Sequence, residues 1–142
     1  MNTTPAAVAS AVTFVWLGMV LAISFLEAPL KFRAPGVTIP IGLGIGRLVF
    51  RALNLVEAAL AVAVIAAVAA GGAPAGITGL TGAVALVLLG QLAVVRPRLN
   101  RRSDRVLAGE DLPRSRGHLA YVALETAKVV VLVVLGVSLL AT

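Results

Sequence analysis

The chain has 142 residues, of which 60% are hydrophobic, and its mean hydropathy is +1.05. This composition excludes an ordinary soluble domain, in which about half of the residues are apolar, and indicates an integral membrane protein of one domain, residues 1–142. The net charge of +6 would suggest nucleic acid in a soluble protein, but here we expect membrane lipids as partners instead. The absence of cysteine excludes disulfides and thiolate metal sites.

Four apolar segments predict an all-α fold, a bundle of four transmembrane helices, because about 20 apolar residues cross the hydrocarbon core. The segments run at about 6–28, 46–70, 77–95 and 118–140. Pro29 should end or kink the first helix, since proline lacks a backbone N–H. Residues 31–45 are expected to form a connector, 71–76 a tight turn, and 96–117 a basic polar loop that opens with Arg96-Pro97-Arg98.

Basic residues predict how the bundle is oriented, because Lys and Arg are retained on the cytoplasmic side. They occur around the first connector, and seven arginines lie in 96–117, whereas the N-terminus and the 71–76 turn have no Lys or Arg. We therefore expect a multi-pass protein of the cell (inner) membrane with both termini outside.

Polar side chains recur about one turn apart in the cytoplasmic halves of the helices at 46–70 and 118–140, a spacing that places them on one helical face. With a rise of about 1.5 Å per residue, Glu57 and Lys128 lie deepest, roughly 15 Å inside. Ionisable residues at this depth normally face a protein interior or a wet cavity. The predicted ligand-binding site consists of Glu27, Arg47, Arg51, Asn54, Glu57, Gln91, His118, Tyr121, Glu125 and Lys128.

The residue types favour a small anionic or amphiphilic ligand, because arginine binds carboxylate or phosphate through its planar fork. In this hypothesis Arg47 and Arg51 hold the anion in a cavity that opens to the cytoplasm. Glu57 and Lys128 form a deep gate, and His118 with Glu125 exchanges protons. The protein would bind or transport its ligand, with proton coupling left open, and no cofactor is identified. Tyr121 is expected to hydrogen-bond within the network.

Other interpretations stay open. In a second interpretation the charges only neutralise one another, since buried charges must be paired, and the chain is an accessory subunit of a larger complex. A homo-oligomer is also compatible with the sequence. The hypothesis of an enzyme acting on a lipid or quinone is weaker, because no catalytic motif is present.

A metal site is disfavoured by the nearby cations. For Gly42-x-Gly44-x-Gly46, flexibility or close helix contact is favoured over phosphate binding, and Trp16 is interpreted as packing.

The layout resembles a family of small four-helix membrane proteins. The resemblance rests on Trp16-x-Gly18, Pro29-x-x-Phe32, Arg96-Pro97-Arg98 and His118. This uncharacterised family includes a eukaryotic transmembrane protein linked to drug tolerance and is distantly similar to the membrane domain of copper-resistance D proteins. The resemblance implies a four-helix bundle, a proline-containing exit from the first helix and a histidine that opens the fourth. A copper role is weakened because sulfur ligands are missing.

Overall fold

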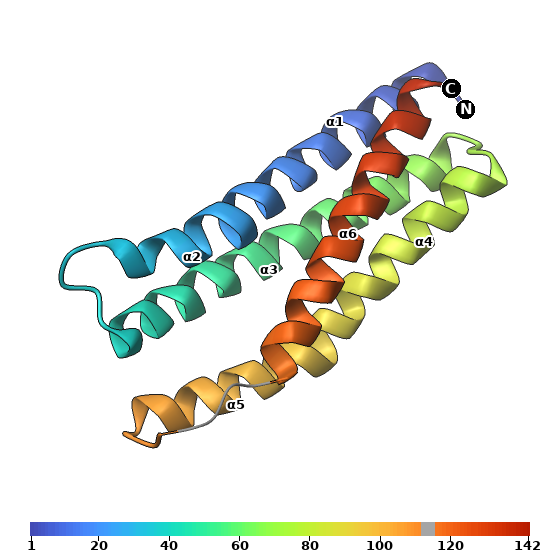
Figure 1. The fold of residues 1–142 in the computed structure, drawn as a ribbon. Helices are drawn as coiled ribbons and strands as arrows, with labels where there is room; N and C mark the ends of the chain where they lie inside the picture. Colours follow the sequence, from blue (N-terminus) through green and yellow to red (C-terminus); the bar gives the residue numbers. More distant parts are fainter. Residues whose placement is uncertain (112–115) are drawn as a thin grey trace.

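The computed structural model describes residues 1–111 and 116–142, and within these ranges the chain forms helices and turns but no strand. Four of the helices described are long and apolar enough to cross a membrane. They span Thr3–Arg33, Ile39–Ala70, Ala75–Leu107 and Arg116–Leu140. Figure 1 shows them side by side as a bundle, with both chain termini at the same end. The predicted all-helical fold with four potential spans is confirmed.

The first long helix continues through Pro29, where the sequence predicted an end or a kink. It comprises α1 (Thr3–Val20), the π-helical segment η1 (Leu21–Glu27), α2 (Ala28–Leu30) and the 3-10 turn η2 (Lys31–Arg33). In η1 the hydrogen bonds reach one residue further back than in an α-helix, and the N–H of Ala28 binds the carbonyl of Ile23. A π-helical turn adds one residue to the ladder, so the helix can pass a residue that donates no hydrogen bond.

The second long helix, α3, runs from Ile39 to Ala70. Thr38 caps it by accepting a hydrogen bond from the N–H of Ile41 at 3.4 Å, and Pro40 is tolerated because the first turn needs no donor. The predicted connector at 31–45 is therefore wrong for most of its length. Gly42 lies inside α3, and a Cβ atom there would collide with the ring of Phe32. Close contact, one of the two roles expected for this glycine motif, is found at Gly42, whereas the space around Gly44 is open.

The third long helix was predicted to stop at Arg96-Pro97-Arg98, and this prediction is wrong. It comprises α4 (Ala75–Gly90), a second π-helical segment η3 (Gln91–Val95) and α5 (Arg96–Leu107). The N–H of Arg96 binds the carbonyl of Gln91, five residues back. As at Pro29, a π-helical segment ends two residues before the proline, and the helix continues through it. Much of the predicted basic loop is thus helical, while residues 112–115 lie outside the described ranges.

The last helix, α6 (Arg116–Leu140), packs against α1 and α4 around an apolar core in the half of the bundle that holds the termini. Trp16, Val64, Leu132 and Leu135 are fully buried in this core. The turn between α3 and α4 closes the same end, where the N–H of Asn2 donates to the carbonyl of Gly71 at 2.8 Å. The polar residues described below lie from the centre of the bundle toward the opposite end.

Substitution of Gly71 tests the packing at this end of the bundle. A Cβ atom at this position would lie 2.9 Å from Cβ of Pro5 and 3.0 Å from the carbonyl oxygen of Ala67. We expect Gly71→Ala to lower the free energy of unfolding in detergent by about 1–3 kcal/mol, the usual cost of overpacking. The control is Gly79→Ala, because the space around Gly79 is open. It should leave stability unchanged or slightly raised. Equal stability of the two variants would contradict the packing described.

Candidate functional site

A fully buried lysine on α6 lies at the centre of the polar residues. The Nζ atom of Lys128 is 2.6 Å from Oε1 of Glu57 on α3 and 2.6 Å from Oε1 of Glu125, one turn earlier on α6. It also donates to Oε1 of Gln91 at 2.8 Å. The exposed fractions of Lys128, Glu57 and Glu125 are 0%, 1% and 1%. Two carboxylates thus share one ammonium away from solvent, which is the pairing that buried charges require.

The two carboxylates are satisfied unequally. Glu125 accepts hydrogen bonds from Ser24 Oγ and Tyr121 OH, each at 2.7 Å, and from Gln91 Nε2 at 3.3 Å. Glu57 accepts from Trp16 Nε1 at 2.9 Å, on the oxygen that also faces the lysine. Its other oxygen is buried and has no hydrogen-bond partner among the described residues. The carboxylate of Glu125 is therefore the more firmly held of the two.

Both π-helical segments deliver a side chain to this cluster. Ser24 belongs to η1 and Gln91 to η3, and both bind Glu125. Together with Glu57 of α3, they bring the other three long helices into contact with Glu125 and Lys128 of α6, and Trp16 of α1 donates to Glu57. We name Trp16, Ser24, Glu57, Gln91, Tyr121, Glu125 and Lys128 the buried cluster.

Five of the ten predicted site residues belong to the buried cluster, namely Glu57, Gln91, Tyr121, Glu125 and Lys128. The other five lie elsewhere. Glu27 is 3.7 Å from Lys31, its neighbour one turn on. Arg47 pairs with Asp104 of α5, and His118 is exposed at the start of α6; both line the cavity described below. Arg51 and Asn54 line a second hollow, which shares Arg47, Arg96 and Asn100 with the cavity described below.

The polar residues of α3 face different sides of the helix for a geometric reason. Residues ten apart on a helix differ by about 80° around the axis, because each residue turns about 100°. Glu57 consequently faces the bundle interior while Arg47 faces α5 and Arg51 is exposed. Glu27 and Arg47 find their partners, Lys31 and Asp104, outside the predicted site.

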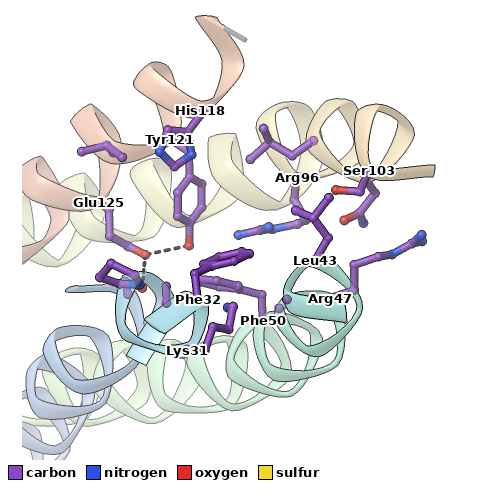
Figure 2. Close-up of a pocket in the computed structure, with 18 of the residues that line it drawn as sticks. Lys31, Phe32, Leu43, Arg47, Phe50, Arg96, Ser103, His118, Tyr121 and Glu125 are labelled. Carbon is purple, nitrogen blue, oxygen red and sulfur yellow. Dashed lines mark hydrogen bonds between the residues drawn. The ribbon is translucent and has the colours of Figure 1, made fainter. Parts of the chain in front are cut away.

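A cavity of about 510 Å³ leads from the surface to the buried cluster. Its walls come from η1 to η2, the start of α3, α5 and the start of α6, and Glu125, Ser24 and Tyr121 reach it from the cluster. Figure 2 shows Phe32 and Phe50 beside these groups, with Lys31 nearby and Arg47 extending away toward Ser103. The cavity thus combines aromatic walls, a polar inner end and several cations.

Arg96 is the cation that the cavity walls hold most closely. Its guanidinium carbon lies 4.5 Å from the ring centroid of Phe50 and 4.5 Å from that of Tyr121, and Figure 2 shows the side chain directed toward both. Such cation–π contacts hold arginine in a fixed plane. Its Nε and Nη2 atoms are buried, and neither finds a hydrogen-bond acceptor in the described part of the chain. Arg96 therefore presents donors that lack an acceptor.

Sequence reasoning missed Trp16, Ser24 and Arg96. The indole N–H of a buried tryptophan normally finds an acceptor. The position of Trp16 in mid-helix therefore indicated a buried acceptor nearby, and in the structure this acceptor is Glu57. Arg96 was assigned to a loop because Pro97 follows it, and no sequence pattern identifies a π-helical segment. The hydrogen bond expected for Tyr121 is confirmed.

Among the described residues, no group of three or more His, Cys, Asp or Glu is placed to hold a metal ion. The chain matches no family profile, no curated protein and no solved structure. The functional argument therefore rests on the chemistry of the cavity and the buried cluster.

Replacing the central lysine tests the buried cluster. We expect Lys128→Met to lower the free energy of unfolding by about 3–5 kcal/mol, because two buried carboxylates lose their shared cation. Thermal unfolding of the purified protein in detergent measures the change. Arg105→Gln is the control, since Arg105 pairs with Glu110 at 2.8 Å with both side chains at least half exposed. That variant should lose no more than about 1 kcal/mol. Equal losses in the two variants would refute the cluster's role.

Proposed function

We propose that this chain is an integral membrane protein that binds or transports a small amphiphilic anion in the cavity beside Arg96. The observation that carries the proposal is the guanidinium of Arg96. A buried donor without an acceptor costs free energy. A ligand oxygen would supply the missing acceptor if the rings of Phe50 and Tyr121, which flank the guanidinium, shifted slightly to admit it. The fork geometry of arginine suits a carboxylate or a phosphate.

The rest of the cavity suits the apolar part of such a ligand. Its walls include the side chains of Phe25, Phe32, Leu43 and Phe50. A cavity of about 510 Å³ is within the usual range for small-molecule sites, roughly 300–1,000 Å³, which are mostly apolar with a few polar groups that fix the orientation. An anionic head on an apolar body matches both features at once.

The distribution of charge supports an orientation for this site. The basic ends of α3 and α5 belong on the cytoplasmic side by the positive-inside rule, and Lys31, Arg47 and Arg96 then line a cavity that faces the cytoplasm. Both termini, which lie together at the other end of the bundle, would be outside. The apolar core between Trp16 and the termini would seal the cavity from that side.

The residues of the buried cluster take a different role from the one expected for them. Glu57 and Lys128 are paired at 2.6 Å in the centre of the bundle, which suits a fixed floor for the cavity better than direct contact with a ligand. Glu125 lies at the boundary between the cluster and the cavity. Arg96 replaces Arg47 and Arg51 as the proposed anion-binding residue, because Arg47 already has Asp104 as its partner.

The proposal predicts a specific effect of Arg96. Dodecyl phosphate is a suitable probe because it joins a phosphate head to an apolar chain, and its binding can be followed by the fluorescence of the single tryptophan, Trp16. We expect Arg96→Gln to weaken binding roughly 10–100-fold, the equivalent of about 1.5–3 kcal/mol for lost charged hydrogen bonds.

The matched control is Arg98→Gln, two residues further along α5, because this arginine is exposed and does not line the cavity. It removes the same charge from the same helix and should leave the affinity within about twofold, the scale of a screened surface charge. Equal weakening in both variants would show that dodecyl phosphate responds to general positive charge, and the proposed site would be wrong.

A further inference from the structure

The wall of the cavity beside Arg96 includes two partly exposed residues on the side of the bundle. These residues, Phe25 of η1 and Val122 of α6, are 42% and 40% exposed. They lie on the two helices that form facing walls of the cavity, one turn or less from the hydrogen bond between Ser24 and Glu125. The cavity therefore meets the outer surface of the bundle between η1 and α6.

The two helices are close together elsewhere and diverge only at this end. Near the termini, a Cβ atom on Gly136 of α6 would lie 2.8 Å from the ring of Phe14 of α1, so α6 packs directly against this side chain of α1. Figure 1 shows α1 and α6 adjacent near the termini and separated toward α2 and the start of α6. The opening is thus a consequence of how the helices cross.

The opening lies at a particular depth in the predicted membrane. Arg96 is 21 residues after Ala75, the start of its helix, which is about 32 Å at a rise of 1.5 Å per residue. This length matches the hydrocarbon core of about 30 Å, so Arg96 lies where lipid headgroups meet acyl chains. Val122 lies six residues inside the start of α6, about 9 Å along its axis, beside the upper part of the acyl chains.

We propose that the occupant of the cavity is a bilayer lipid with a phosphate monoester head, which enters sideways between η1 and α6. The inference rests on the proposed function, since it places the anion at Arg96. The phosphate would contact the guanidinium of Arg96, with the ammonium of Lys31 also on the cavity wall. An acyl chain would leave between Phe25 and Val122 and remain among the surrounding lipids.

The charge of the cavity favours a phosphate monoester over other lipid heads. Three cations, Lys31, Arg47 and Arg96, line it against one carboxylate, Glu125. Lys31 lies beside Glu27 and Arg47 pairs with Asp104, so the buried guanidinium donors of Arg96 are the ones that lack an acceptor among the described residues. A monoester carries about 1.5–2 negative charges near neutrality and three acceptor oxygens, whereas a carboxylate carries one charge and a choline headgroup adds a cation. The volume of the cavity accommodates a head and the first part of a chain, so a chain that extends into the bilayer fits it without enlargement.

Photochemical labelling tests the side opening. The protein is placed in nanodiscs that contain a phosphatidic acid with a diazirine in one acyl chain, and labelled residues are mapped by mass spectrometry. The proposal predicts labels at Phe25 and Val122 that disappear in Arg96→Gln. It also predicts no such labels with a phosphatidylcholine that carries the same diazirine. Labels only at cavity residues other than Phe25 and Val122, or the same pattern with both lipids, would overturn lateral access.

A bulky residue at the opening provides a second test. Val122→Trp should abolish labelling by the phosphatidic acid probe while water-soluble hexyl phosphate still binds. Val130→Trp is the control, because Val130 is 56% exposed on the same helix and does not line the cavity; it should leave both probes unaffected. If Val122→Trp does not fold, the labelling map of the unaltered chain decides the matter.

The two probes separate failure of this inference from failure of the proposed function. If hexyl phosphate binds and depends on Arg96 but the lipid probe leaves Phe25 and Val122 unlabelled, the anion site stands and the side opening is refuted. If neither probe binds, the anion site itself is refuted. Retained lipid labelling in Val122→Trp would also refute the side opening, because the path between η1 and α6 would then be unnecessary.

Discussion

One ammonium group shared by two carboxylates determines how the bundle is put together. Lys128 lies 2.6 Å from both Glu57 and Glu125, and the surrounding hydrogen bonds extend to the other two long helices. Away from water, these charges depend on one another and on the few side chains that hydrogen-bond to them, so sliding or rotation of a helix would leave a buried charge without its partner. Apolar packing between Ala-, Val- and Leu-rich helices tolerates many arrangements, whereas this cluster tolerates one.

The two π-helical segments connect this constraint to the cavity. Each precedes a proline, each lies toward the same end of the bundle, and each supplies one side chain to Glu125. Because a π-helical turn inserts a residue into the ladder, it rotates the side chains that follow it relative to an uninterrupted α-helix. Arg96 comes directly after η3 and reaches Phe50 and Tyr121. The same backbone feature thus lets the helix pass Pro97 and contributes to the placement of the arginine.

Sequence patterns predicted the four helices and the central part of the site, because apolar length and charge at membrane depth are strong constraints. On α6 the one-turn spacing of Tyr121, Glu125 and Lys128 led directly to three buried partners. The same reasoning failed on α3, where the spacing drifts around the axis and Arg51 is exposed. The sequence also misassigned Arg96 to a loop, because a proline normally predicts a helix end. The helix nevertheless continues through Pro97 after the π-helical segment η3, which no local sequence pattern identifies.

The central claim is that the guanidinium of Arg96 holds the phosphate of an amphiphilic ligand. A solid-state NMR measurement of the dipolar coupling between phosphorus of bound dodecyl phosphate and ¹⁵N in the arginine side chains tests it most directly. The account predicts a coupling that corresponds to a hydrogen-bonded pair, with N–O about 2.7–2.9 Å, and its loss in Arg96→Gln. A coupling that persists unchanged in Arg96→Gln, and so arises from other arginines, would contradict the account.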